Sequence, residues 1–243
     1  MSLKKVIVSF VAVIYLSLGL AQQKSPTVED VLTKAQQVFT TTPSYAIDIN
    51  YQMFGNYTKT VAMEAFDGQM VKANKDTYLK INNTIFLTSE TKKTNVKVFE
   101  DEHVIEVSEK ETNSLMTNSP VYIENFIKLF KNKTIVDKGD YYMCTLTTDV
   151  ITQVPYGKIE LFIDKDSYVI TKQVLYFLAE YPFIDENGKQ QKGNPKMVVT
   201  LSNFKKEISQ ELTEVTDIKQ YITKTGDSYK PSATYKEFKI IQN

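Results

Sequence analysis

The sequence predicts a mainly antiparallel β protein with helices on one face of the sheet, an α+β fold. Many short segments alternate between apolar and polar residues with a period of two, as half-buried strands do. The connections between these segments are short enough for hairpins, which pair strands antiparallel. Two other segments place apolar residues at helical spacing, so each must bury one side. With 42% apolar residues among 243, the chain can build one core.

The first predicted helix covers 28–40. Thr27 is a suitable N-cap, and Asp30 lies three residues later, as in a capping pair. A second helix is predicted over 120–131, because Ser119 can cap it and Pro120 suits its first position. The apolar stripe of the second helix consists of Ile123, Phe126, Ile127 and Phe130. We expect both helices to pack on the dry face of the sheet.

Strands are predicted in chain order by the same alternation. The first covers 45–53, and the second covers 61–65 and runs to a bulge or turn at Asp67-Gly68. Asn82-Asn83 and Asp101-Glu102 supply two of the later turns. Further strands are predicted at 77–81, 84–89, 94–99, 104–108, 133–137, 141–148, 158–164, 168–179 and 196–206. Short connections make this an antiparallel meander.

One face of the sheet is expected to be dry and the other wet. Leu79 and Ile81 point to one side and Lys80 to the other, and several strands repeat this pattern. The strand at 168–179 is apolar on both sides near its end, so we expect its outer side to be covered, with the C-terminal segment as the candidate cover. We expect one domain over 22–206 and a C-terminal extension over 207–243 that packs on it.

The first 21 residues have the layout of a secretory signal peptide. Lys4 and Lys5 precede an apolar run, and small residues end at Ala21, before an expected cleavage site at Gln22. An uncleaved membrane anchor is the alternative, but the run is short for a span of about 20 residues. No cysteine follows the site, which argues against an acylated lipoprotein. We expect a periplasmic or secreted protein.

The composition argues against several classes of function. All 29 basic residues are lysine, and they balance 29 acidic residues, so neither the guanidinium groups nor the basic surface typical of nucleic-acid binding is present. Glycine numbers only 8, and no Walker or dinucleotide-binding motif occurs. Cys144 is the only cysteine and His103 the only histidine, so the usual zinc sites cannot be assembled. We expect no nucleic-acid partner, no metal and no cofactor.

No catalytic centre is visible in the sequence. His103 lies in a charged stretch that is typical of a solvated turn. The run from Asp164 to Ser167 begins like a calcium loop, but Val169 and Leu175 occupy the places of the required glycine and glutamate. Carboxylate pairs for glycosidic chemistry stay open, because their separation is a three-dimensional quantity. We expect a protein that is not an enzyme.

The order of the elements carries a family resemblance over about 28–206. The first helix leads directly into a strand, and a mid-chain helix separates two groups of strands. The most similar stretches are Phe66-Asp67-Gly68, Thr77 to Ile81, Ile159 to Asp164, Tyr168 to Lys172 and Met197 to Phe204. Together they resemble the LolA/LolB superfamily of periplasmic lipoprotein carriers. The resemblance implies an incomplete β-barrel wrapped round helices, with an apolar cavity for lipid acyl chains.

No binding residue is carried over from the family, because carriers of the LolA type use an early-strand arginine that this chain lacks. Aliphatic residues outnumber what two short helices can cover, and together with the resemblance this leads us to expect that the concave dry face binds lipoprotein or lipid acyl chains, with a membrane-associated protein as a further partner. A filled core on the same scaffold would instead favour a non-catalytic protein-binding or sensor module. The expected lipid-binding residues are Ile49, Tyr51, Met53, Val61, Met63, Leu79, Ile81, Ile105, Val107, Phe126, Phe130, Ile159 and Leu161.

Overall fold

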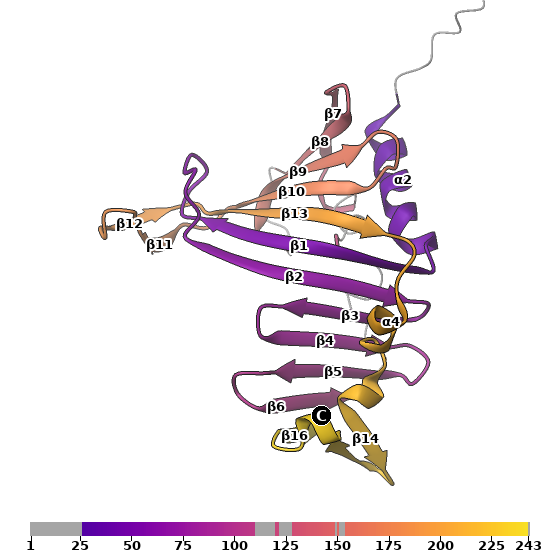
Figure 1. Cartoon of the computed structure of the whole chain (residues 1–243). Coiled ribbons are helices and arrows are strands. Elements are labelled where there is room, and N and C mark those ends of the chain that lie inside the picture. The colour runs from indigo at the N-terminus through magenta and orange to yellow at the C-terminus, as the bar shows by residue number, and fades with distance from the viewer. Residues whose placement is uncertain (1–25, 110–119, 122–127, 149, 151–153, 243) are drawn as a thin grey trace, which may run out of the picture.

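A computed structural model describes residues 26–109, 120–121, 128–148, 150 and 154–242 (Figure 1). The expected signal peptide lies outside these residues. So do Ile123, Phe126 and Ile127 of the expected second helix.

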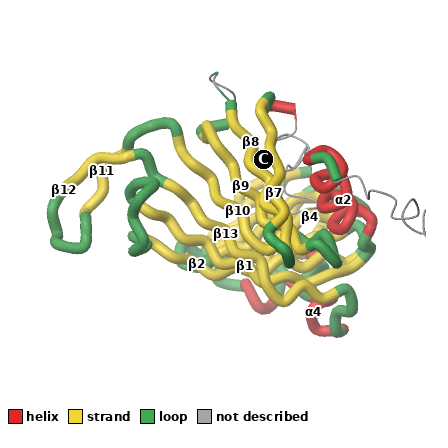
Figure 2. The backbone as a smooth tube through the Cα atoms, turned by 90° about the horizontal axis from the view of Figure 1, so that it is seen from above, coloured by secondary structure: helices red, strands yellow, loops and turns green. Residues whose placement is uncertain are grey.

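The described chain forms one large, curved sheet of twelve strands (Figures 1 and 2). Neighbouring strands are antiparallel, except that β16 runs parallel to β6, and the order is β16-β6-β5-β4-β3-β2-β1-β13-β10-β9-β8-β7. The sheet is not closed, since β16 and β7 are its two edges. The predicted fold class is therefore confirmed. The strands are β1 (Ser44–Phe54), β2 (Glu64–Ala73), β3 (Asp76–Ile81), β4 (Thr84–Ser89), β5 (Thr94–Phe99), β6 (Val104–Ser108), β7 (Asn132–Asp137), β8 (Tyr141–Thr147), β9 (Tyr156–Asp164), β10 (Ile170–Phe177), β13 (Lys196–Lys205) and β16 (Lys239–Gln242).

Several shorter elements lie outside the twelve-stranded sheet. The hairpin of β11 and β12 projects beyond one end of it (Figure 1). The segment after β13 consists of short helices and a second hairpin before it reaches β16. Sequence analysis did not predict these elements, because each is too short to show a period. They are β11 (Tyr181–Ile184), β12 (Gln190–Gly193), α4 (Gln210–Glu214), η1 (Ile218–Gln220), β14 (Ile222–Thr225), β15 (Ser228–Pro231) and η2 (Ala233–Tyr235).

Helix α2 (Val28–Thr41) forms where the sequence predicts it. The Thr27 hydroxyl accepts a hydrogen bond from the Asp30 amide, and the Asp30 carboxylate accepts one from the Thr27 amide, both at 3.1 Å. This capping box satisfies donors that the first turn would leave free. At the other end, the buried Lys72 ammonium donates to the carbonyls of Phe39 (3.1 Å) and Thr40 (3.4 Å). Both ends of α2 are therefore held by side chains.

The predicted bulge or turn at Asp67-Gly68 is wrong. Strand β2 begins at Glu64 and passes through Gly68 without interruption, pairing Gly68 with Ile49 on one side and Ile81 on the other. A Cβ at Gly68 would lie 2.7 Å from the carbonyl oxygen of Lys80. The glycine therefore marks a close approach of two backbones inside the sheet, which is the other meaning of a glycine in a strand.

Which face is buried differs between strands: β1–β3 bury residues on both sides, β5 and β6 bury one side, and β8 and β9 bury the opposite side. We call the side that packs against α2 the α2 face, and the opposite side, which packs against residues 208–240, the C-terminal face. Figure 2 shows α2 and α4 on opposite sides of the sheet. Buried strand residues of the α2 face include Tyr45, Ile47, Ile49, Met70, Leu79, Cys144, Leu161, Val199 and Leu201. Those of the C-terminal face are Ala46, Val71, Tyr78, Ile85, Leu87, Val96, Val98, Ile105 and Val107.

The outer side of β10 is covered by a different segment from the one we expected. Val174 packs in a small cluster with Phe54 and Val198, and Ala62 lies against it. Tyr57, from the β1–β2 connection, stacks edge-on against Tyr176 at 5.1 Å. The cover therefore comes from residues 55–63, because they fold back over the strand, and the C-terminal segment lies over β2–β6 instead.

Candidate functional site

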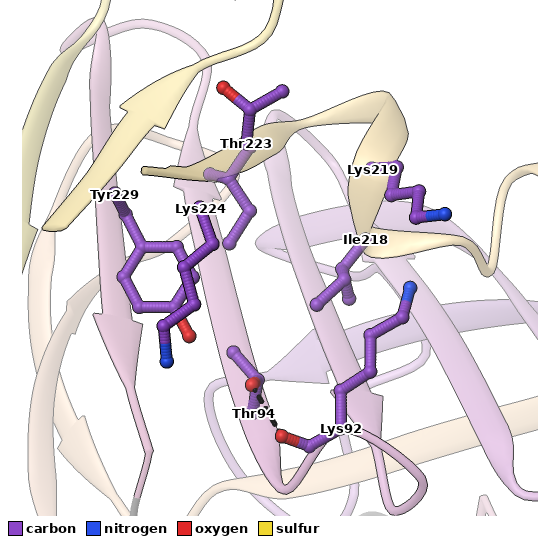
Figure 3. A pocket seen from close by; sticks show the side chains of 8 residues that line it. Lys92, Thr94, Ile218, Lys219, Thr223, Lys224 and Tyr229 are labelled. Atoms are coloured by element: carbon purple, nitrogen blue, oxygen red, sulfur yellow. Dashed lines mark hydrogen bonds between the residues drawn. The ribbon is translucent and has the colours of Figure 1, made fainter. Parts of the chain in front are cut away.

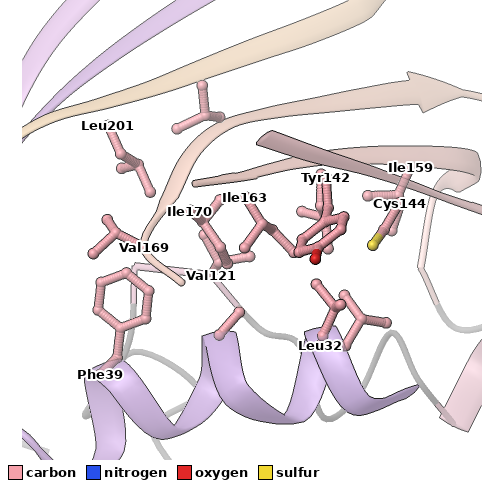
Figure 4. Close-up of a cluster of buried hydrophobic side chains, with 14 of the residues drawn as sticks. Leu32, Phe39, Val121, Tyr142, Cys144, Ile159, Ile163, Val169, Ile170 and Leu201 are labelled. Atoms are coloured by element: carbon pink, nitrogen blue, oxygen red, sulfur yellow. The ribbon is translucent and has the colours of Figure 1, made fainter. Parts of the chain in front are cut away.

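The α2 face brings together most of the residues expected to bind a lipid. Strand pairing places Ile49 opposite Leu201, and Leu161 opposite Cys144, so these side chains share one side of the sheet. Figure 4 shows the part of this cluster that lies directly on α2, with Leu32 and Phe39 pointing toward the strands. In the cluster, Ile49, Leu79, Phe130, Ile159 and Leu161 are buried, and Tyr51 and Ile81 are half-buried against them.

Ile105 and Val107 do not lie on that face. They pair with Val98 and Val96 of β5, and those residues pair with Ile85 and Leu87 of β4. All belong to the cluster of the C-terminal face, where Ile218, Tyr221, Ile222 and Tyr229 cover them. The single concave face expected from the sequence is therefore divided, because alternation within a strand does not say which of its two sides faces the neighbouring layer.

Three more of the expected residues, Met53, Val61 and Met63, lie at the end of the sheet away from α2. Met53 is half-buried near the end of β1, opposite Met197. Val61 and Met63 lie in the connection before β2 and are 63% and 40% exposed. Phe126 lies outside the described residues.

On β1 and β2, burial of the α2 face decreases away from α2. Phe39 and Tyr45, at the helix, are 0% exposed, and Phe66, opposite Tyr51 on β2, is 38% exposed. Half-buried residues packed against the same cluster include Tyr51, Ile81, Phe86, Tyr156, Phe177 and Met197. Among the described residues, α2 therefore covers one end of an apolar surface that continues toward the β1–β2 connection.

Gln173 is a buried polar side chain on this face, away from the Lys72 ammonium at the end of α2, and the sequence analysis missed it. On β10 it lies opposite Leu161 of β9 and Val199 of β13, and it is 4% exposed. Within the described residues, its Nε2 is the only buried side-chain nitrogen or oxygen without a hydrogen-bond partner. Leaving a buried donor unpaired costs about 1–3 kcal/mol. The sequence could have indicated this position, because Gln173 and Leu175 are two residues apart on one strand and their side chains therefore point to the same side of the sheet.

Titratable groups near this face are held in their neutral forms by burial. Burial raises the pKa of Tyr51 to about 12. Burial, with a smaller contribution from Glu29, also raises the pKa of the Cys144 thiol to about 12. A thiol with so high a pKa is a poor nucleophile at neutral pH. Among the described residues, the middle of the face therefore offers apolar contact and one amide.

His103, the only histidine of the sequence, does not belong to the cluster of the α2 face. It adopts a positive φ of 53° in the turn before β6, and its ring stacks on Phe238 at 4.9 Å. Within the described ranges, no three histidine, cysteine, aspartate or glutamate side chains gather in a way that could hold a metal ion. Nor does any helix in those ranges have the length and hydropathy to span a membrane.

Comparisons with known proteins find no matching family model and no matching curated protein. Solved structures do match. A LolA superfamily protein from Nitrosomonas europaea is 14% identical, with 79% of this chain and 98% of that chain covered and a TM-score of 0.33. An outer-membrane lipoprotein-sorting protein domain from Vibrio parahaemolyticus is 9% identical, with 78% of this chain and 97% of that chain covered and a TM-score of 0.33. The lipoprotein LppX from Mycobacterium tuberculosis is 10% identical, with 75% of this chain and 99% of that chain covered and a TM-score of 0.39.

These matches include the superfamily that the element order of residues 28–206 resembles. Identities and TM-scores this low do not transfer a ligand or a binding residue. What the α2 face can bind follows instead from its own side chains.

Proposed function

We propose that this protein binds the acyl chain of a lipid or lipoprotein on its α2 face, as a carrier rather than as an enzyme. Apolar surface that is only half-buried supports this proposal, since Tyr51, Ile81 and Met197 continue the core beyond α2. An acyl chain lying on them would leave water, with a gain of about 0.8 kcal/mol for each buried methylene.

The observation that carries the proposal is the unpartnered amide of Gln173. A purely hydrocarbon ligand would leave its Nε2 unpaired, whereas the carbonyl oxygen of an ester or amide could accept its hydrogen bond. Lipids and lipoproteins carry this acceptor at the head of an apolar chain. The combination of an apolar face and one buried donor therefore favours an acyl group over an alkane.

Export is part of the proposal. The positively charged start, the apolar run and the small residues before Gln22 support secretion into the periplasm or the medium. We expect the mature protein, purified from its own host, to begin at Gln22 on N-terminal sequencing. A protein that still begins at Met1 would contradict this part.

The test uses the mature protein and two fluorescent ligands with the same chain, one a fatty acyl ester and the other the corresponding alkyl ether. The Gln173→Leu variant is expected to lose about tenfold in affinity for the ester, since one hydrogen bond is lost, and to keep its affinity for the ether. Gln52→Leu, on the other side of the sheet, is the matched control and should bind both ligands like the wild type.

A second pair of variants tests the surface itself. Phe66→Ala removes a partly exposed ring from the α2 face, and we expect weaker binding of both ligands. Phe162→Ala removes a ring from the opposite side and should leave binding unchanged. If the wild type shows no saturable uptake, or Gln173→Leu and Gln52→Leu behave alike, the carrier proposal fails. The protein-binding or sensor module then becomes the better reading.

A further inference from the structure

A pocket lies on the C-terminal face, on the opposite side of the sheet from the proposed acyl site (Figure 3). Its volume is about 420 Å³, which is within the range of about 300–1,000 Å³ for small-molecule sites. Its walls come from two parts of the chain that are far apart in sequence, the start of β5 and the C-terminal segment. The lining residues are Lys92, Thr94, Ile218, Lys219, Ile222, Thr223, Lys224 and Tyr229.

The inner part of the pocket is apolar. Ile218, Ile222 and Tyr229 belong to the buried cluster of the C-terminal face. Thr94 is also buried, and its hydroxyl donates to the carbonyl oxygen of Lys92 at 2.9 Å. The one donor of that hydroxyl is therefore already used. The base of the pocket is suited to an apolar body rather than to a polyol or a sugar.

Three ammonium groups surround this apolar base. In Figure 3, Lys92 and Lys219 stand on one side, and Lys224 lies beside the Tyr229 ring on the other. Lys92 pairs with Asp217 at 2.7 Å, and Lys224 pairs with Glu109 at 2.5 Å. Lys219 forms no ion pair within the described part of the chain. Three cations thus face two carboxylates; Asp217 interacts with both Lys92 and Lys219, and one positive charge is left in excess.

We propose that this pocket binds a small monoanionic amphiphile, which is a compact apolar body with one carboxylate or sulfonate group. The apolar body would cover Ile218 and Ile222, and the anion would pair with Lys219. A neutral apolar ligand would leave that cation without a partner, and a dianion would carry more charge than the pocket balances. Because the lining includes both β5 and the C-terminal segment, a bound ligand stabilises the contact between them.

The probe for the test is 8-anilinonaphthalene-1-sulfonate, an aromatic body with one sulfonate, titrated into the full mature protein. We expect one saturable site, affinity that falls as salt rises, and a higher melting temperature when the probe is bound. Lys219→Glu reverses the charge of an exposed side chain and should weaken binding about tenfold. The matched control is Lys230→Glu, an exposed lysine in the adjacent β14–β15 hairpin and outside the lining, and it should bind like the wild type.

A second variant separates this pocket from the α2 face. Ile218→Phe enlarges a side chain of the lining and should reduce binding even at high salt, because it fills the space that the probe needs. Gln173→Leu and Phe66→Ala, which alter the α2 face, should leave the probe affinity unchanged. The proposal is overturned if the wild type has no saturable site for the probe. It is also overturned if Lys219→Glu and Ile218→Phe, both folded, bind the probe like the wild type.

Discussion

The two faces of the sheet are covered by layers of very different construction. The α2 face is covered by a 14-residue helix with its own capping box and apolar stripe. The C-terminal face is covered by α4 and η1, of five and three residues, a short hairpin and stacked rings. Helices this short are not stable alone in water. The first layer is thus encoded locally, and the second forms only because the sheet supplies a surface for it.

Polar groups also differ between the two layers. The α2 face buries Lys72 and Gln173 completely. The C-terminal face keeps its charges at the edge, where Lys92 pairs with Asp217 and Lys224 pairs with Glu109. Buried polar groups are costly unless they have partners, and exposed pairs contribute little. Substitutions should therefore have larger effects on the α2 face, except where they remove the second layer altogether.

The largest expected effect comes from ending the chain after Lys206. This change removes β16 and exposes the buried valines and isoleucines of β5 and β6, including Val98 and Ile105. We expect loss of cooperative unfolding and aggregation, because an unpaired edge and an apolar face are exposed together. Circular dichroism melting and size-exclusion chromatography measure this, with the full mature chain as control. A soluble, cooperative monomer would show that the second layer is dispensable.

A matched pair of cavity variants compares the packing of the two layers. Phe39 is fully buried and meets Tyr45 and Phe204 edge-on, with both ring centroids 5.7 Å from its own. Phe39→Ala should therefore lower the free energy of unfolding by about 3–5 kcal/mol. Ile218 lines the pocket, so for Ile218→Ala we expect a loss of about 2 kcal/mol in the free energy of unfolding, at the low end for such a change. Denaturant unfolding gives both values. Equal losses would mean that the layers are packed equally well.

Lys72→Met tests the polar cap of α2. The change leaves the carbonyls of Phe39 and Thr40 without their donor, so we expect a loss of about 1–3 kcal/mol. Burial lowers the pKa of Lys72 below 10.5, partly offset by Glu90. The unfolded chain therefore keeps this proton to higher pH, and the free energy of unfolding should rise with pH between the lowered pKa and 10.5.

Unfolding measured across that pH range should show the rise in the wild type and not in Lys72→Met. Lys75→Met, at an exposed position nearby, is the control. The same rise in both variants would mean that another group titrates.

The smallest expected effect is that of Asp48→Asn, where β1 meets β2 and β13. Hydrogen bonds from Asn203 and Gln69 hold the pKa of the Asp48 carboxyl below 3.8. Its contribution is present above pH 3.8 and is lost as the pH falls through the lowered pKa. We expect the variant to lose about 1 kcal/mol at neutral pH and nothing at lower pH. Acid unfolding curves, compared with those of the exposed Asp140→Asn, would contradict this if both variants shifted alike.

Much of the fold could be predicted because its determinants are local. Thr27 and Asp30 lie close enough in sequence to cap α2 whatever the rest of the chain does. Asn82 adopts a positive φ of 50° in the expected turn, since asparagine tolerates that conformation. The alternation of β3 to β6 predicted those strands to within a residue or so. Turn and cap chemistry act over a few residues, so they can be read from the sequence.

The face that each strand buries was decided by tertiary structure. Alternation shows that Leu79 and Tyr78 point to opposite sides, but the pairing register and the covering segments decide where each side chain packs. Ile105 and Val107 therefore joined the C-terminal face, although their pattern matches that of Ile49. The role of Gly68 was also decided by tertiary structure. A turn and a close approach of two backbones both favour glycine, so the sequence does not distinguish between them.

For the candidate site, the sequence by itself determined that strands with alternating apolar residues would build the sheet and its buried side. Only the tertiary structure isolated Gln173 among Leu161 and Val199 on neighbouring strands. Likewise, it brought Lys92 to Lys219 across more than 120 residues of chain to form a pocket. The physical reason is the same in both cases. A buried amide and a charged pocket are defined by their neighbours in space, and those neighbours are set by long-range strand pairing.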